Sequence, residues 1–555
     1  MARSLLINYS GYPAVMRSLA LDNGLANLAG SLINSGHQTR ILDYATVDTI
    51  RRLFPYEYSV ELISLTGRIM SSLQQGSLPQ RDDLKAFSDL DRRINQLQKE
   101  KVNQISKEIS DYSKAYGADF VGLKLWSGDG FEGSIAIARK LKEDNPKLHI
   151  FAGGPHVDSF MENIFDVCDV FDVLVYGEGE ETITMLADYV SGERELEDIP
   201  NLIYKDNGKI ITTPIRRVEN LDSLAPPIYY EDVYLAMKGN RKIKTVFIDE
   251  SRGCPNHCSY CIHPIKSGNR WRGRTAERVV EQMEEMKRKY GFTAFRFAGS
   301  NPPPLLKKGI ADQILRRGLK IVYSAFGHIT DGLTVDFQLL RESGCYSLFF
   351  GIESGSQRIL DESMNKRIRV DQIEETIKAS KDAGLYVVGS VIIPAPLETE
   401  ETKKESFDLL LRLRPDSVVV WFPALMLGTD WERNSQKYGF QIRDRKSFFR
   451  EAMLYKIKSF YPPALWGSSS EYKLNGKSFE QITRETGDFK RSLEKNGILT
   501  DVTSETAVIA RYAKMSPRDF RDKTRKYLSA GDYESIAELV SRINQEILRG
   551  EPSFV

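Results

Sequence analysis

The sequence contains little cysteine and no long apolar run, and each shortage excludes a class of protein. Only five of the 555 residues are cysteine, which is too few for a disulfide framework and favours a reducing compartment. No stretch approaches the ~18 consecutive apolar residues that a membrane-spanning helix needs. We therefore expect a soluble, cytoplasmic protein with no membrane span.

The chain also lacks an excess of charge of either sign. Its 77 Lys and Arg residues nearly cancel its 76 Asp and Glu residues, which leaves a formal net charge of +1. Because binding to nucleic acid or to an anionic membrane requires a basic surface, we expect neither as the main partner. The chain is too long for a single hydrophobic core, and about three domains are expected.

Three of the five cysteines lie in one short segment, Arg252-Gly-Cys254-Pro-Asn-His-Cys258-Ser-Tyr-Cys261. The CxxxCxxC spacing follows an apolar strand and places three thiolates on one tight loop. Iron–sulfur cubanes are ligated by cysteine thiolates, and three protein ligands leave one iron open. The spacing therefore predicts a 4Fe-4S cluster held by Cys254, Cys258 and Cys261.

A zinc site is the main alternative for these cysteines. Structural zinc needs four ligands, and the other two cysteines, Cys168 and Cys345, are isolated in the sequence. Only His257 or His263 lies close enough to complete a set. A non-catalytic zinc-binding protein stays as a minor hypothesis.

With Tyr260 directly before the last cysteine, the segment resembles the signature of the radical S-adenosylmethionine (SAM) family. The resemblance implies that the open iron binds the amino and carboxylate groups of SAM. It also implies cleavage of SAM to a 5′-deoxyadenosyl radical, so that the cofactors carry the chemistry and the protein directs it. An electron donor such as flavodoxin or ferredoxin is an implied partner.

Six β-branched or aromatic runs recur between residues 241 and 425. Amphipathic stretches separate these runs, most clearly at residues 278–290 and 370–383. Short buried strands that alternate with helices predict a parallel sheet, and six units are fewer than a closed eight-stranded barrel needs. We expect a partial (β/α)6 barrel, as the resemblance also implies, with the cysteine loop at the carboxyl end of its first strand.

Later strand ends resemble the SAM-binding segments of the same family. The segment Gly351-Ile-Glu353-Ser354-Gly355-Ser356 implies that Glu353 and Ser354 contact the SAM ribose, and Ser390 belongs to the segment that cradles the adenosine portion. A carboxylate can accept hydrogen bonds from two vicinal hydroxyls. A glycine-rich turn with a capping serine explains the first segment about as well.

The segment after strand two departs from the family pattern. Many relatives have a carboxylate there, whereas this chain has Phe297-Ala298-Gly299-Ser300-Asn301-Pro302. Backbone carbonyls or Ser300 could receive the SAM amino group instead. Gly299, Ser300 and Tyr260 complete the candidate SAM contacts.

Residues 1–204 show a second alternation of strands and helices, with helices expected at residues 23–34 and 134–143. This pattern predicts a Rossmann-like doubly wound sheet. In such sheets ligands bind beyond the carboxyl ends of the strands. The small-residue loops at these ends contain Ser127, Gly128, Gly153, Gly154, Pro155, His156, Gly177, Glu178 and Gly179.

Together with the cysteine motif, the GGPH and GEGE loops resemble the cobalamin-binding class of radical SAM enzymes. The resemblance implies that these nine residues surround cobalamin. An unliganded or nucleotide-binding Rossmann domain is the alternative, although the GxGxxG fingerprint is absent. The Asp-x-His-x-x-Gly segment is also absent, so the lower face of cobalt is expected to lack a histidine.

The remaining segments are a polar helical insertion at about residues 51–117, a connector at 205–240 and a mainly helical C-terminal domain at 426–555. A packed helical hairpin is the favoured interpretation of the insertion, with a partner-binding coiled coil as the minor one. We expect an aromatic cluster in the last segment to fill a core or to cover the barrel mouth. The cluster comprises Phe448, Phe449, Tyr455, Phe460, Tyr461 and Trp466.

The function that the resemblance implies most directly is methylation of an unactivated carbon by a cobalamin-dependent radical SAM methyltransferase. Cyclisation, ring contraction or another rearrangement is the alternative within the same family. The sequence assigns no catalytic acid or base. A small molecule or a peptide is expected as the substrate.

Overall fold

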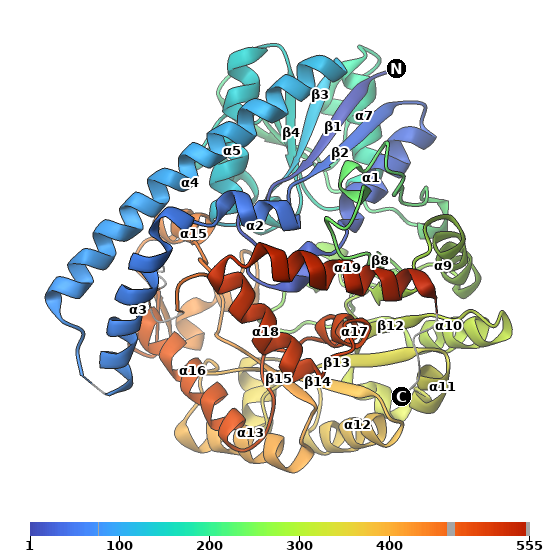
Figure 1. The fold of residues 1–555 in the computed structure, drawn as a ribbon. Coiled ribbons are helices and arrows are strands. Elements are labelled where there is room, and N and C mark those ends of the chain that lie inside the picture. The colour runs from blue at the N-terminus through green and yellow to red at the C-terminus, as the bar shows by residue number, and fades with distance from the viewer. Residues whose placement is uncertain (76, 463–464, 466–471, 551–555) are drawn as a thin grey trace.

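The N-terminal part of the chain forms a doubly wound sheet in a computed structural model that describes residues 1–75, 77–462, 465 and 472–550 (Figure 1). Parallel strands run in the order β2-β1-β3-β4-β5, and the antiparallel strands β6 and β7 follow. This order places the topological switch between β1 and β3. The strands are β1 (Arg3–Asn8), β2 (Gln38–Asp43), β3 (Phe120–Lys124), β4 (His149–Gly153), β5 (Val173–Val175), β6 (Leu202–Asp206) and β7 (Lys209–Thr212).

Helices cover both faces of this sheet because consecutive strand residues are apolar, so that both faces are buried. Leu6 of β1 packs in one core with α1 (Asn23–Asn34) and α7 (Glu180–Val190). Its neighbours Leu5 and Ile7 pack in another core with α5 (Asp129–Asp144). The prediction of a doubly wound sheet is confirmed.

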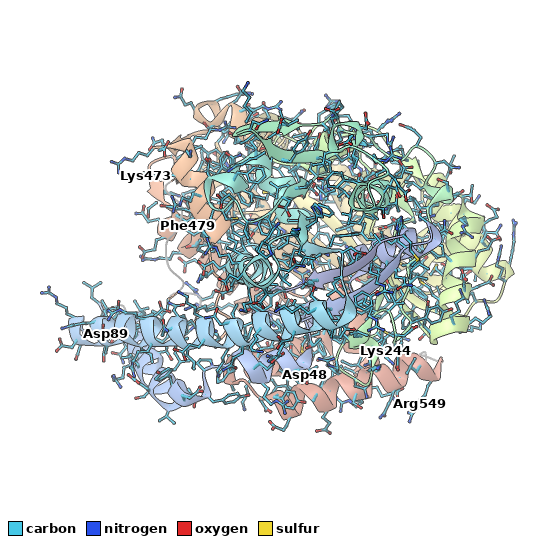
Figure 2. The ribbon with its side chains drawn as sticks, turned by 90° about the horizontal axis from the view of Figure 1, so that it is seen from above. Asp48, Asp89, Lys244, Lys473, Phe479 and Arg549 are labelled. Atoms are coloured by element: carbon cyan, nitrogen blue, oxygen red, sulfur yellow. The ribbon has the colours of Figure 1, made fainter. Side chains whose placement is uncertain are left out.

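The helical insertion lies between β2 and β3. It consists of α2 (Val47–Leu53), α3 (Ser59–Gln74) and α4 (Arg81–Tyr116), and α3 and α4 form a packed hairpin. In Figure 2, α4 runs along one side of the molecule, and Asp89 marks the part that projects away from the sheets. The expected hairpin is confirmed.

The central part of the chain forms an open parallel sheet in the order β15-β14-β13-β12-β11-β8. The outward-facing residues of its strands pack against the following helices in one core. The strands are β8 (Val246–Ile248), β11 (Ala294–Phe297), β12 (Val322–Gly327), β13 (Cys345–Glu353), β14 (Tyr386–Ile392) and β15 (Ser417–Trp421). The helices are α9 (Ala276–Tyr290), α10 (Pro304–Arg316), α11 (Phe337–Glu342), α12 (Val370–Asp382) and α13 (Glu400–Leu413).

The C-terminal part is mainly helical and links the two sheets (Figure 1). Three helices, α17 (Ser504–Tyr512), α18 (Pro517–Ala530) and α19 (Tyr533–Arg549), share a core with the first sheet and its insertion. A small antiparallel sheet, which the sequence did not predict, joins β16 (Phe440–Ile442), β17 (Tyr472–Leu474) and β18 (Lys477–Ser478). The other helices of this part are α14 (Asp430–Arg433), α15 (Arg445–Leu454) and α16 (Phe479–Lys495).

The predicted aromatic cluster divides between two cores. Phe448 and Phe449 are buried with the small sheet, whereas Phe460 and Tyr461 are buried with the insertion. Tyr455 is half-buried against the first of these cores, and Trp466 lies outside the described residues. The interpretation as core is confirmed for the four buried rings.

One predicted boundary is wrong in detail. The strands β6 and β7 form a hairpin around Asn207 and Gly208, and β6 pairs with β5. The first sheet therefore extends to Thr212 rather than ending at residue 204, because the hairpin covers an otherwise unpaired edge of β5. The other domain limits stay predictions. Within the described residues, no helix is long and apolar enough to cross a membrane.

Candidate functional site

The cysteine loop begins beyond the carboxyl end of β8 and is closed at its base by a short pairing. β9 (Ser251–Arg252) pairs with β10 (Arg272–Gly273), so residues 253–271 form one loop. Gly253 has φ of +98°, and a Cβ there would lie 2.1 Å from the carbonyl oxygen of Arg270. Only glycine allows this closure. Because the loop begins beyond the carboxyl end of β8, it lies at the edge where parallel barrels have their active sites.

Cys254 is buried, Cys258 and Cys261 are half-buried, and the loop thiols influence one another. Burial raises the pKa of Cys258 above its usual range and that of Cys261 to about 12, and the neighbouring thiols add to both shifts. The Asn301 side-chain amide lies 3.8 Å from the sulfur of Cys254. Because a thiol must lose its proton to ligate a metal, these thiols suit a highly charged centre that displaces the protons.

The structure favours a cluster over a single zinc ion. Within the described parts of the chain, no three His, Cys, Asp or Glu side chains are placed to hold one metal ion. His263, a possible fourth zinc ligand, is paired through Nδ1 with Ser300 Oγ at 3.1 Å. A zinc ion needs four ligands that converge on one point, whereas each cysteine of a cubane binds a different iron.

Side chains from three other strand ends surround the loop. Ser300 follows β11 and contacts His263. His328 follows β12, and its Nε2 lies 3.2 Å from Nδ2 of Asn256 within the loop. Lys366 follows β13, and its ammonium donates to the Tyr260 hydroxyl at 3.2 Å. The loop, Tyr260 and Ser300 therefore meet at one edge of the barrel, as predicted.

Glu353 is held at this edge by a buried ion pair. Lys366 donates to its Oε1 at 3.2 Å, and both side chains are about nine-tenths buried. Burial opposes the charge on Lys366, but Glu353 and the loop thiols hold its pKa above the usual range. Glu353 also has φ of +66° next to a register shift in β13, a feature that re-aims side chains near active sites.

The two predicted serines differ in their surroundings. The Ser354 hydroxyl is fully buried and lies 3.1 Å from that of Ser406 in α13, so it braces the turn. Ser390 of β14 lies beside Gly351 of β13, and the hydroxyl of this buried residue has no hydrogen-bond partner among the described residues. Of the two, only Ser390 has a hydroxyl that remains available to a ligand.

The small-residue loops of the first sheet lie beyond the ends of β3 and β4. The Ser127 hydroxyl is 3.3 Å from Nδ1 of His156, and the His156 ring is packed between Phe131 and Phe160. Burial lowers the pKa of His156 to about 3, so its ring is neutral. Its Nε2 is buried without a hydrogen-bond partner in the described structure, and a buried polar atom of this kind suits a bound ligand as its partner.

Glycine conformation shapes these loops. Gly128, Gly154 and Gly177 have φ values of +61°, +95° and +75°, which side chains rarely adopt. Gly153 ends β4, Pro155 starts α6 (Pro155–Phe160) and Gly179 precedes α7. Gly128 is buried against Tyr455. The backbone at the other four glycines is at least partly exposed at the sheet edge, where doubly wound folds bind their ligands.

The two acids of the GEGE loop bind the cysteine loop rather than open space. Glu178 accepts from Arg272 at 2.5 and 3.0 Å, and Glu180 pairs with Arg252, two residues before Cys254. Burial opposes the charge on Glu180, but Arg252 holds its pKa below the usual range. These ion pairs fasten the edge of the first sheet to the base of the cysteine loop.

Comparison with known proteins agrees with this arrangement. Residues 250–410 match the model of the Radical SAM superfamily, and residues 89–187 match that of the B12 binding domain. The chain is 33% identical over 315 residues to an uncharacterized methyltransferase of Pyrococcus horikoshii, an alignment that covers 56% of this chain and 67% of that protein. The chain belongs to the cobalamin-binding radical SAM family. Its cofactors are a 4Fe-4S cluster, SAM and cobalamin.

Other relatives of this radical SAM enzyme carry out different reactions. It is 27% identical over 286 residues to the anaerobic magnesium-protoporphyrin IX monomethyl ester cyclase of Rubrivivax gelatinosus. This alignment covers 50% of this chain and 51% of the cyclase. It is 22% identical over 413 residues to the cytidylyl-2-hydroxyethylphosphonate methyltransferase of Streptomyces wedmorensis, with 67% and 76% covered. The relatives therefore include both methyltransferases and cyclases.

Two solved structures share the fold of this radical SAM enzyme. One is the methyltransferase TsrM of Kitasatospora setae with cobalamin and a [4Fe-4S] cluster bound. The two structures have a TM-score of 0.56 at 16% sequence identity, and the comparison covers 80% of this chain and 77% of that chain. The other is OxsB with aqua-cobalamin and SAM bound, with a TM-score of 0.56, 15% identity, and 97% and 72% covered. At these identities the likeness concerns the fold.

Several charged or polar residues of the radical SAM enzyme's site were missed from the sequence, four of which bear on the proposed cofactor contacts. Arg252, Arg272, Asn301 and Lys366 all contact predicted site residues or the cysteine loop. Arg252 and Asn301 lie inside quoted motifs, so their position was a signal. Lys366 and Arg272 lie far from the residues they contact, and no local pattern marks them.

Proposed function

We propose that the chain is a C-methyltransferase that acts on an unactivated carbon. The observation that carries this proposal is the pair of salt bridges, Arg252–Glu180 and Arg272–Glu178, that join the loops for the two cofactors. When bound there, the cofactors supply a hydrogen-abstracting radical and a methyl group to one volume. Cys254, Cys258 and Cys261 are the proposed cluster ligands.

The proposed SAM contacts are grouped around Lys366. This ammonium holds the Glu353 carboxylate and the Tyr260 hydroxyl in fixed positions, and a fixed carboxylate can accept bonds from the ribose hydroxyls. Ser390 and the backbone at Gly299 and Ser300 complete the set. Ser354 supports the turn through Ser406, and we assign it no direct contact.

The proposed cobalamin cradle is the edge formed by the loops after β3, β4 and β5. Close backbone approach is assigned to Ser127, Gly153, Gly154, Pro155, Gly177 and Gly179, and Gly128 seats the loop against the segment at Tyr455. His156 supplies a neutral, unpaired ring nitrogen. Glu178 is better assigned to the link with Arg272. An external electron donor and a small-molecule or peptide substrate belong to the same proposal.

A cyclisation or rearrangement without methyl transfer is the second candidate, because cyclases are among the curated relatives. Anaerobically reconstituted enzyme given deuteromethyl SAM and candidate substrates separates the two. Methylation predicts a product that gains the labelled methyl group and depends on Cys254, Cys258 and Cys261. Formation of 5′-deoxyadenosine together with a changed but unlabelled product would instead establish the rearrangement.

A further inference from the structure

Glu250, between β8 and β9, points its side chain beneath the segment after β11. Its side chain is fully buried, with an exposed fraction of 0%. Its carboxylate accepts from the backbone N–H of Gly299 at 3.1 Å to both oxygens. It also accepts at 3.0 Å from the N–H of Ala298, which is shared with the Ile248 carbonyl at 2.9 Å. A Cβ on Gly299 would lie 2.4 Å from Oε1 of Glu250, so glycine is needed for this approach. A carboxylate from the neighbouring strand end thus lies against the segment that has none of its own.

The orientation of the intervening peptide gives this contact a consequence. The N–H of Gly299 and the carbonyl of Ala298 belong to one trans peptide and point in opposite directions. The Ala298 carbonyl therefore faces away from Glu250, and no donor among the described residues bonds to it. A charged acceptor on the N–H side of a peptide polarises it and strengthens its carbonyl as an acceptor.

We infer that Glu250 is a positioning residue for the amino group of SAM. It fixes and polarises the peptide between Ala298 and Gly299, so that the Ala298 carbonyl accepts a hydrogen bond from the SAM ammonium. Many relatives have a carboxylate in the segment after strand two. Here Glu250 supplies the negative charge from the neighbouring strand end, and the peptide between Ala298 and Gly299 transmits its effect. The inference rests on the proposed binding of SAM at this edge.

The competing role for Glu250 is as a buried partner of Arg296 on β11. Arg296 donates to the Phe297 carbonyl, and its charge favours ionisation of both Glu250 and Glu505 of α17. Burial raises the pKa of Glu250 to about 7, with Asp249 adding to the shift and Arg296 opposing it. Burial also raises the pKa of Glu505. No hydrogen bond joins Glu505 to the 298–299 peptide among the described residues, so Glu505 is the matched control.

The test compares Glu250→Gln and Glu505→Gln in the reconstituted holoenzyme. SAM is titrated into the reduced protein, and its dissociation constant is taken from the change in the cluster's electron paramagnetic resonance (EPR) spectrum. We expect Glu250→Gln to bind SAM roughly tenfold more weakly at pH 8, because a neutral amide has one acceptor oxygen in place of two and is a weaker acceptor than a carboxylate. Iron, sulfide and cobalamin contents should match wild type, and Glu505→Gln should bind SAM normally.

Two further measurements distinguish this positioning role of Glu250 from a purely structural one. The ratio of the SAM dissociation constant of Glu250→Gln to that of wild type should shrink below about pH 7, where Glu250 is protonated. The titration of SAM itself affects both constants equally and cancels in this ratio. Glu250→Asp keeps the charge but withdraws it from the peptide, and it should weaken SAM binding to an intermediate degree. Wild-type affinity in Glu250→Asp or Glu250→Gln, or an equal loss in Glu505→Gln, would overturn the inference. A wild-type spectrum that ignores SAM would instead overturn the proposed function.

Discussion

A small network of ion pairs fastens the base of the cysteine loop to the first sheet, and Arg252 has the most partners in it. It pairs with Glu180 and Asp249, and only 17% of its side chain is exposed. Removing one partner of a buried pair leaves an uncompensated charge and costs about 3–5 kcal/mol. We expect Arg252→Gln to lower the free energy of unfolding by about 3 kcal/mol, measured by urea denaturation.

A double-mutant cycle and a pH series check this assignment. Adding Glu180→Gln should recover part of the loss, because it removes the charge that Arg252→Gln leaves unpaired. The pKa of Glu180 is lowered from 4.5 in the folded protein, so the pair stabilises the fold above about pH 4.5 and this contribution is lost as the pH falls further. Additive effects of the two substitutions would contradict a direct pair.

At the scale of elements, the segment after α15 closes on the loop after β3. Gly128 donates its N–H to the Met453 carbonyl at 2.9 Å, and a Cβ on Gly128 would lie 2.3 Å from the Tyr455 carbonyl oxygen. Gly128→Ala must therefore push the two segments apart. We expect it to reduce bound cobalamin several-fold while the iron content stays at the wild-type level.

Gly192→Ala is the matched control for this prediction. Gly192 also has a positive φ, +76°, but a Cβ there meets nothing within 4 Å. It should cost only about 1 kcal/mol of backbone strain and leave cobalamin binding intact. Equal loss of cobalamin in both variants would show that strain, and not the contact with Tyr455, is responsible.

The elements that could be predicted are those with a local pattern. The strands of both parallel sheets alternate with amphipathic helices, and the cysteine spacing is contiguous, so both were evident in the sequence. The pairing of β6 with β5, the sheet of β16 to β18 and the contact of Lys366 with Glu353 join residues distant in the sequence. Such pairings depend on tertiary packing, which the local repeat of apolar residues along the sequence does not determine.

At the scale of the whole molecule, α19 joins the first sheet's insertion to the barrel. In Figure 2 it runs along the side that carries Asp48 and Lys244 and ends at Arg549. Asn544 accepts from the Lys244 N–H at 2.8 Å, and Thr293 donates to the Ile547 carbonyl at 2.6 Å. The helix buries Ile536, Leu539, Val540, Ile543 and Ile547.

Removing residues 533–555 should therefore unfold or aggregate the protein. Five buried aliphatic side chains contribute on the order of 10 kcal/mol at ~1.5–3 kcal/mol each, which is comparable with the whole stability of a typical domain. We expect little soluble protein and strong binding of a hydrophobic dye by what remains. A soluble truncated protein that loads both cofactors would contradict this role of α19.

The central claim is that the loops of the two sheets hold the cluster and cobalamin at one shared site. EPR spectroscopy tests it directly, with the holoenzyme poised so that cobalt is Co(II) and the cluster is first oxidised and then reduced. We expect the Co(II) signal to broaden on reduction of the cluster. We expect no broadening in Cys254→Ala, because this variant loses a cluster ligand. A Co(II) signal that stays unchanged, with both cofactors bound and the cluster reduced, would contradict the shared site.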